Sequence, residues 1–150
     1  MKLLHAAGKR DYDRIRVDWN ATPAGNCGRM TLTDYIYDMP IQMAAADLVI
    51  SRAGAMSISE LALTGKAVVF IPSPYVAENH QYKNAMALVD QGAALCVEEK
   101  TLTDGALTAT VKSLLKDPAG RADMERRIRD FACPDANEQI YTHLMGLLKT

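Results

Sequence analysis

A row of small residues follows an apolar run in the middle of the chain, over residues 52–57. The run itself, 47–51, is typical of a buried parallel strand, and 56–64 has the composition of a helix. Small side chains let a backbone approach a ligand closely, and the first turn of a helix offers unpaired N–H groups. The segment Arg52-Ala53-Gly54-Ala55-Met56-Ser57 therefore predicts a diphosphate-sized anion site at the start of the helix.

Glu60 lies one turn inside the same predicted helix. A carboxylate there can accept two hydrogen bonds from the vicinal hydroxyls of a ribose, as an acidic residue does in dinucleotide-binding folds. The alternative is that Glu60 only complements the positive end of the helix dipole. The Ser-x-x-Glu pattern on its own leaves both interpretations open.

A second group of polar residues follows the apolar run 67–71 and begins another predicted helix, 79–91. His80, Gln81 and Asn84 supply donors and acceptors suited to the hydroxyl and N-acetyl groups of a sugar. In the alternative interpretation, Asn79 caps the helix and the other side chains are solvated. Because ligands bind at the carboxyl ends of parallel strands, the two groups are expected at the same edge of one sheet.

The composition of the 150 residues, 49% hydrophobic and 23% charged, is that of a globular protein. With 17 Lys plus Arg against 18 Asp plus Glu, the net charge of -1 argues against nucleic-acid binding. No apolar stretch approaches the roughly 20 residues of a membrane span, and no export signal begins the chain. Three widely spaced cysteines predict neither a disulfide framework nor a metal site. We expect a cytoplasmic location, with no metal and no cofactor.

Short apolar runs alternate with helical patterns, which is typical of a parallel sheet flanked by helices. The predicted strands are 2–5, 30–36, 47–51, 67–71 and 93–97, and a first helix is predicted over 11–19. The last third is helical throughout, and its final helix is expected to bury Ile140, Leu144, Leu147 and Leu148. These elements predict an α/β fold with a Rossmann-like parallel sheet.

Five segments in this order, 35–40, 46–55, 59–61, 71–74 and 79–85, resemble the carboxyl-terminal domain of MurG-type N-acetylglucosaminyltransferases, of glycosyltransferase family 28. The resemblance implies one half of a two-domain GT-B fold, the half that binds UDP-N-acetylglucosamine. It also implies transfer of N-acetylglucosamine, with inversion, to undecaprenyl-diphosphate-MurNAc-pentapeptide in peptidoglycan synthesis. Helix-end N–H groups rather than a metal stabilise the UDP leaving group in such enzymes.

The resemblance also implies roles for single residues. The backbone of Ile36 binds the uracil with Met39 nearby, segment 54–57 holds the diphosphate, and Glu60 binds the ribose. Gln81 contacts the sugar hydroxyls, and the matching segment includes Asn84. His80 stands where many relatives have glutamine, although its imidazole can still donate one hydrogen bond. Arg52 matches an arginine beside the diphosphate loop that can be structural. No catalytic base is assigned.

Two parts of the family pattern have no counterpart in residues 1–150: the amino-terminal acceptor domain and the first strand of the carboxyl-terminal domain. That strand is central in the order 3-2-1-4-5-6, so the strands present should fall into two groups, 3-2 and 4-5-6. We expect these groups to close directly, to pack poorly, or to receive a complementary chain between them.

This incomplete domain is expected to bind the donor without catalysing transfer, and to reach a lipid-linked acceptor at the inner face of the plasma membrane only through the missing domain. The alternative is a subunit of a split N-acetylglucosaminyltransferase that works with a separate chain.

Overall fold

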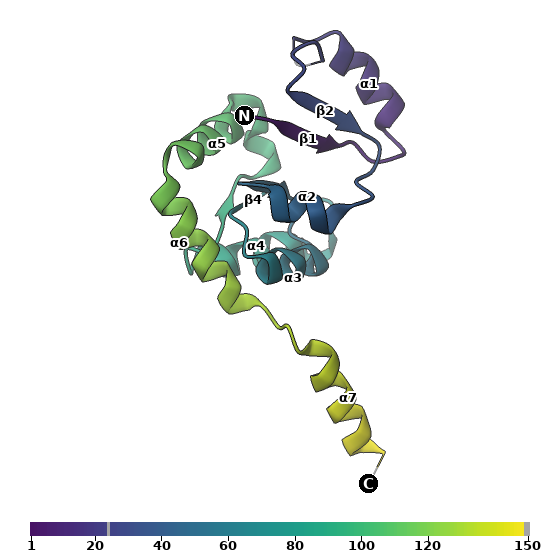
Figure 1. The fold of residues 1–150 in the computed structure, drawn as a ribbon, viewed down its shortest axis with the longest axis vertical. Helices are drawn as coiled ribbons and strands as arrows, with labels where there is room; N and C mark the ends of the chain where they lie inside the picture. The colour runs from purple at the N-terminus through teal and green to yellow at the C-terminus, as the bar shows by residue number, and fades with distance from the viewer. Residues whose placement is uncertain (24, 149–150) are drawn as a thin grey trace. The chain divides into compact units, whose positions relative to one another are not determined.

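The structure is a computed structural model and describes residues 1–23 and 25–148. The chain divides into two compact units, Met1–Gln42 and Met43–Thr150. Figure 1 follows the chain through its helices and strands. Among the described residues, no helix combines the length and the apolar character needed to cross a bilayer.

The first unit consists of two parallel strands and a helix. Strand β1 (Leu3–Ala6) pairs with β2 (Met30–Thr33), and helix α1 (Tyr12–Asn20) connects them. The ring of Trp19 on α1 meets the ring of His5 edge-on, with 6.0 Å between centroids. None of the described residues of this unit is fully buried. Helix α2 (Met39–Ala45) then leads from the first unit into the second.

The second unit contains a three-stranded parallel sheet in the order β3-β4-β5. Its strands are β3 (Val49–Ser51), β4 (Val68–Phe70) and β5 (Leu95–Cys96). Ser51 pairs with Phe70, which pairs with Cys96, so the three strands end at one edge of the sheet. The loops that follow them therefore meet at that edge.

Five helices and three short 3₁₀ segments complete the described part of the second unit. The helices are α3 (Ala55–Thr64), α4 (His80–Val89), α5 (Ala106–Lys116), α6 (Pro118–Ile128) and α7 (Ala136–Leu147). The 3₁₀ segments are η1 (Ala77–Asn79), η2 (Glu99–Asp104) and η3 (Arg129–Phe131). Gly65 ends α3 in the left-handed conformation (φ 61°), which is common for glycine at the end of a helix. Asp117 caps α6 by accepting a hydrogen bond from Gly120 N at 2.9 Å.

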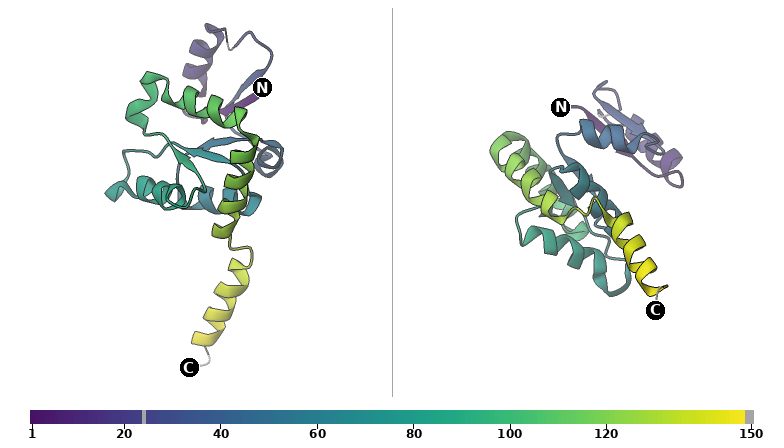
Figure 2. Two further views of the ribbon diagram at one scale, coloured as in Figure 1. Left: turned by 90° about the vertical axis from the view of Figure 1, so that its left-hand side faces the viewer. Right: turned by 60° about the horizontal axis from the view of Figure 1, so that its bottom comes forward.

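Two apolar clusters form the core of the second unit, and β4 contributes to both. Val68 and Phe70 pack with residues of α3 and α4, whereas Val69 packs with Leu114 of α5 and Met124 of α6. Successive side chains of a strand point to opposite faces of the sheet. Helices accordingly cover both faces, as Figure 2 shows. This arrangement confirms the predicted α/β class and explains why 67–71 is apolar at every position.

The strands fall into the two groups that the sequence predicts, one of two strands and one of three. Each of the five predicted strands is present: β1 is shifted by one residue and the other four are shorter than predicted. The helix predicted over 56–64 is confirmed as α3. Helix α2 was not predicted. Its second residue, Pro40, suits a first turn because that position has no intrahelical N–H partner to lose.

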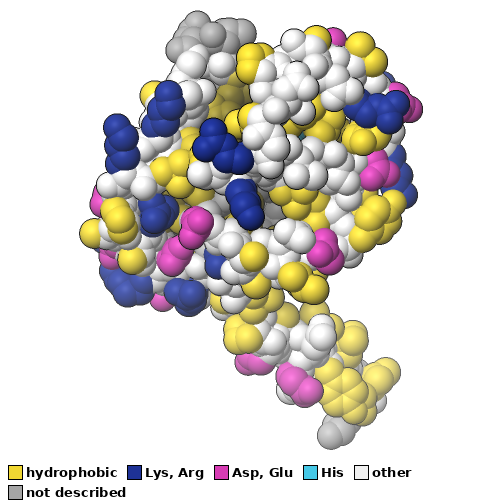
Figure 3. Space-filling view, turned by 45° about the horizontal axis from the view of Figure 1, so that its top comes forward, with side chains coloured by type: hydrophobic (Ala, Val, Ile, Leu, Met, Phe, Trp, Pro, Cys, Tyr) yellow, Lys and Arg dark blue, Asp and Glu magenta, His cyan; other side chains and the backbone are white. Residues whose placement is uncertain are grey.

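Two sequence predictions about helices are wrong. Asn79 does not cap α4 with its side chain: it adopts the left-handed conformation (φ 53°) and makes no side-chain capping bond. The predicted apolar face of the last helix is not buried in the described structure, where the members of that face are between 55% and 78% exposed. Figure 3 shows hydrophobic side chains along α7, the projecting lower part of the view. Amphipathic spacing establishes the helix but not a surface that covers it.

Candidate functional site

Arg52 joins the loops that follow the three strands of the second unit. Its Nη1 donates to the carbonyl oxygen of Ile71, after β4, at 3.1 Å and lies 2.5 Å from Glu99 Oε2, after β5. The Arg52 side chain is half exposed, so the ion pair itself stabilises the fold only modestly. Its effect is geometric, because one guanidinium sets the relative positions of three loops. Arg52 is thus engaged with the protein, in line with a structural role.

The start of α3 presents backbone donors that the described side chains leave open. Gly54 is the N-cap residue (φ -71°, ψ 147°), and no side chain caps the helix. The first N–H groups of a helix have no intrahelical partner. Met56 is 74% exposed, and a Cβ on Gly54 would meet only Ser57 Oγ, at 3.9 Å. Since neither the backbone angles nor a neighbour requires glycine at position 54, the small residue suits close approach by a ligand.

Glu60 is exposed and lies on the sixth residue of α3, beyond the first turn. The helix dipole acts within the first turn, so this position gives Glu60 little dipole stabilisation. No described residue forms a hydrogen bond or an ion pair with its carboxylate. The fold therefore leaves both carboxylate oxygens available to a ligand.

Gln81 and Asn84 each use half of their amide to hold α4 against the loops. Gln81 Oε1 accepts a hydrogen bond from Ser73 N at 2.9 Å, and Asn84 Nδ2 donates to Ala53 O at 3.2 Å. In the described part of the chain, Gln81 Nε2 and Asn84 Oδ1 make no hydrogen bond. Each amide thus retains one free polar atom, a donor on Gln81 and an acceptor on Asn84.

The imidazole of His80 is oriented by its own backbone segment. Its Nδ1 lies 3.0 Å from the carbonyl oxygen of Ala77. A carbonyl can only accept, so Nδ1 carries the proton and Nε2 of the neutral ring is an acceptor. In this tautomer the one N–H of the neutral ring is used by Ala77 O, so the atom that His80 offers to a ligand is the acceptor Nε2.

Two residues just before His80 adopt a conformation that is unusual without glycine. Glu78 and Asn79 both have φ near 53°, in the left-handed region. Such residues cost on the order of 1 to 3 kcal/mol each and occur where a structure must hold a turn at a functional position. Here the strained turn sets the direction in which α4 begins.

Ile36 and Met39 belong to the first unit, which is described by itself. Ile36 is half-buried, and neither its N–H nor its C=O forms a hydrogen bond with another described residue. A free donor beside a free acceptor matches the edge of a pyrimidine that carries one donor and one acceptor. Met39 is 37% exposed at the first position of α2.

Sequence reasoning missed three groups that shape this site: Glu99, Ser73 and the Ala53 carbonyl. Glu99 had a usable signal, because it follows the predicted strand 93–97 and so belongs at the same edge as Arg52. The other two act through backbone atoms, which residue type does not reveal. Near Glu99, burial raises the pKa of the Cys96 thiol, and the neighbouring Glu98 raises it further. A protonated, half-buried thiol is consistent with packing rather than nucleophilic chemistry.

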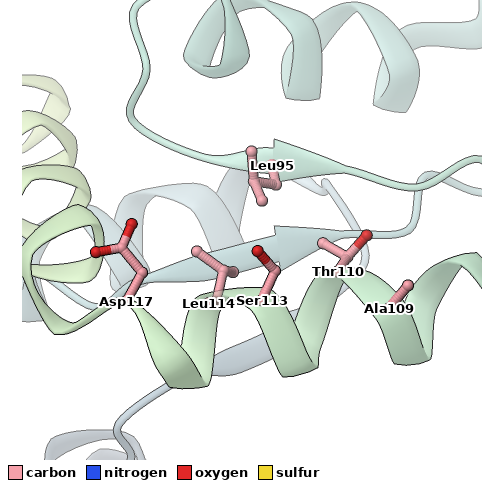
Figure 4. A pocket seen from close by; sticks show the side chains of 6 residues that line it. All are labelled: Leu95, Ala109, Thr110, Ser113, Leu114 and Asp117. Carbon is pink, nitrogen blue, oxygen red and sulfur yellow. The ribbon is translucent and has the colours of Figure 1, made fainter.

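A depression between β5 and α5 involves none of the predicted residues (Figure 4). It is lined by Leu95, Ala109, Thr110, Ser113, Leu114 and Asp117. The Asp117 carboxylate already accepts a hydrogen bond as the cap of α6. The other lining residues supply only two hydroxyl groups, and none of them follows the carboxyl end of a strand. This depression therefore differs from the predicted site, whose residues lie just after the strands.

The family model for the glycosyltransferase family 28 C-terminal domain matches residues 1–140. The chain belongs to this family. It is 38% identical, over 98% of its length, to an enzyme of Acetivibrio thermocellus named UDP-N-acetylglucosamine--N-acetylmuramyl-(pentapeptide) pyrophosphoryl-undecaprenol N-acetylglucosamine transferase. A protein of the same name from Paraburkholderia phymatum is 39% identical over 93% of the chain. The chain spans 39% and 37% of the lengths of these two relatives.

A solved family 28 structure agrees with these matches. The crystal structure of MurG from Acinetobacter baumannii superposes with a TM-score of 0.82 at 28% identity. The superposition covers 97% of this chain and 41% of that protein. A glycosyltransferase of kitacinnamycin shares the fold at a TM-score of 0.54. The resemblance inferred from the sequence motifs, and the GT-B type of fold, are confirmed.

Proposed function

We propose that this chain is the donor-binding part of an inverting transferase that moves N-acetylglucosamine from UDP-N-acetylglucosamine to an undecaprenyl-diphosphate-linked MurNAc-pentapeptide. The single observation that supports it most is the uncapped start of α3, where Gly54 leaves the first-turn N–H groups open. Family membership supports the same reaction, which the names of the two relatives state for those proteins.

In the proposed complex, the diphosphate of the donor lies against Gly54, Ala55, Met56 and Ser57, and Glu60 accepts hydrogen bonds from the ribose hydroxyls. The Ile36 backbone reads the uracil edge, with Met39 beside it. The free atoms of Gln81 and Asn84 and the Nε2 of His80 face the sugar. Arg52 keeps the loops in register through Glu99 and Ile71.

The chemical contribution of these groups is electrostatic. When the glycosidic bond to the diphosphate breaks, negative charge grows on UDP. N–H groups and the positive end of the helix dipole stabilise that charge without having to reorganise. No residue of this chain is proposed as the base that activates the acceptor hydroxyl.

The acceptor is proposed to bind to the part of the full-length enzyme that lies outside the matched stretch, at the cytoplasmic face of the membrane. The 150-residue chain is then expected to bind donor without transferring sugar. An assay of N-acetylglucosamine transfer to a lipid-linked acceptor, with this chain alone, checks that expectation.

The direct test is calorimetric titration of the chain with UDP-N-acetylglucosamine, for wild type, Glu60→Ala and Glu125→Ala. Glu125 is a matched control, because it also lies on a helix of the second unit but far along the chain from α3. Loss of two charge-assisted hydrogen bonds of roughly 1.5 to 3 kcal/mol each predicts at least tenfold weaker binding for Glu60→Ala. Equal affinity of all three proteins contradicts the proposed ribose contact.

A further inference from the structure

A cluster of one lysine and two tyrosines lies at the carboxyl edge of the first sheet. The rings of Tyr35 and Tyr37 meet edge-on, with 5.1 Å between centroids. Lys9 Nζ lies 5.8 Å from the centroid of the Tyr35 ring and 5.6 Å from that of Tyr37. We call Lys9, Tyr35 and Tyr37 the Lys-Tyr-Tyr cluster.

The two segments that build this cluster come together because β1 and β2 are parallel. Ala6 pairs with Thr33 at the end of the strands, and Ala7 N donates to Thr33 O at 2.9 Å. Lys9 follows the first strand and the tyrosines follow the second. Both therefore stand at the edge where parallel sheets bind ligands.

Core packing does not account for the cluster. Tyr35 is 52% exposed and Tyr37 is 74% exposed, although each ring carries a large apolar surface. The backbone beneath them is nonetheless fixed: Tyr35 N donates to Asp34 Oδ1 at 2.8 Å, and Thr33 Oγ1 donates to Tyr35 O at 3.0 Å. A locally hydrogen-bonded backbone thus presents exposed aromatic rings, which is the form of a stacking platform.

Ile36 stands between the two tyrosines, and its N–H and C=O make no hydrogen bond with another described residue. A planar heterocycle can use both features at once, pairing its polar edge with this backbone while an aromatic ring covers its apolar face. The ammonium of Lys9 adds a hydrogen-bond donor for a ring carbonyl.

We propose that the Lys-Tyr-Tyr cluster contacts the base of the nucleotide, with Tyr37 supplying the main stacking surface. This inference rests on the proposed function and assigns three residues to the base-binding end of that site. Tyr35 supports Tyr37 through the edge contact, and Lys9 donates to a carbonyl of the base. The cluster adds affinity for nucleotides but none for a diphosphate without a base.

The test compares UDP with inorganic pyrophosphate, which lacks the base, by calorimetric titration of the 150-residue chain. Tyr37→Leu removes the ring, and Tyr37→Phe keeps it. Tyr141→Leu is the matched control, because Tyr141 is 61% exposed on α7. Since stacking contributes about 1 to 3 kcal/mol per base, Tyr37→Leu is expected to weaken UDP binding about tenfold. Tyr37→Phe should recover most of that loss, and Lys9→Met should weaken UDP binding by about threefold.

In every variant the affinity for pyrophosphate should stay within about twofold of wild type. Pyrophosphate has no base, so the loss of a base contact cannot weaken its binding. Weaker pyrophosphate binding in Tyr37→Leu would mean a structural role and would overturn the inference. If Tyr37→Leu binds UDP as wild type does while Glu60→Ala binds it more weakly, the role proposed for the cluster is wrong and the proposed function stands. Absence of UDP binding to wild type overturns the proposed function and the cluster together.

Discussion

The two units of this chain carry candidate ligand contacts on the same kind of scaffold, but they differ in burial. The first unit, residues 1–42, has two parallel strands and no fully buried residue in its described part. The second unit buries Phe70, Leu61, Ile128, Val68 and Val69 completely or nearly so. Burial of apolar surface stabilises a fold more than its hydrogen bonds do. We therefore expect the sheet of the second unit to be more stable than that of the first, although their hydrogen bonds have similar lengths.

The difference follows from the residues of the strands. Strand β4 is apolar at each position and is covered on both faces, whereas β2 alternates Thr31 and Thr33 with apolar residues. A strand in which polar and apolar residues alternate, such as β2, buries only one of its two faces. The residues proposed to contact the diphosphate thus belong to the unit with a buried core, and those proposed to contact the base belong to the unit without one.

Hydrogen exchange is expected to show this difference most strongly. Ala7 N–H donates to Thr33 O, and Val97 N–H donates to Phe70 O, both at 2.9 Å. The Val97 amide next to the core should exchange slower by on the order of a hundredfold or more, since its opening requires loss of buried contacts. Mass spectrometry or NMR of the exchanging amides measures the ratio. Equal protection of the two amides would contradict the comparison.

Truncation of a core side chain should have the next largest effect. Phe70→Ala removes a fully buried ring and is expected to lower the free energy of unfolding by about 3 to 5 kcal/mol. Leu4→Ala in β1, where the side chain is 37% exposed, should cost under about 1 kcal/mol of global stability. Urea unfolding followed by circular dichroism checks both values. A Leu4→Ala loss as large as that of Phe70→Ala would remove the distinction between the units.

Two left-handed glycines offer a matched pair across the units. Gly65 has φ +61° and Gly8 has φ +80°, and a Cβ on Gly8 would meet no atom within 4 Å. The left-handed conformation costs an L-residue roughly 1 to 2 kcal/mol. Gly65→Ala should lower the global unfolding free energy by at least that amount, because its Cβ would also overlap Arg129 Nε and force that side chain to move. Gly8→Ala should instead speed exchange in β1 and β2 and leave the global midpoint nearly unchanged.

The smallest expected effect depends on pH. Hydrogen bonds from Arg127 and Arg126 hold the pKa of Asp123 below its ordinary value of 3.8. A carboxylate with a lowered pKa in the folded state stabilises the protein above 3.8, and this contribution disappears as the pH falls through the lowered pKa.

Asp123→Asn should therefore lower the melting temperature slightly at pH 7 and not at a pH well below 3.8. Asp13→Asn in the first unit, beside Arg16 at 3.4 Å, should leave the global transition unchanged at both pH values. A larger effect of Asp123→Asn in acid than at neutral pH would have the wrong sign.

The alternation of apolar runs and turn residues was sufficient to predict the α/β class and helix α3, whereas the two groups of strands were predicted from the family resemblance. It failed for the surroundings of α7, because spacing shows that a helix has an apolar face but not what covers it. Residue type also misled at Asn79. Asparagine suits a side-chain cap and the left-handed conformation alike, and only the path of the chain decides between them.

For the site, the motif residues were predicted but several of their partners were not. Gly54 and Glu60 could be proposed from the sequence because the proposal needs only open N–H groups at the start of a helix and a carboxylate one turn further on. The split use of Gln81 and Asn84, half structural and half free, depends on distances between loops that sequence does not encode locally. The proton position on His80 likewise follows from one contact, with Ala77 O, that a residue list cannot reveal.

The measurement that most directly tests the account is an NMR titration of the ¹⁵N-labelled chain with UDP. The amides of Gly54, Ala55, Met56 and Ser57 are expected to show the largest shift changes, because the diphosphate lies against them. The amides of Thr110 and Ser113, in the depression beside α5, should not move. Saturable changes at Thr110 and Ser113 with none at residues 54–57 would contradict the proposed site.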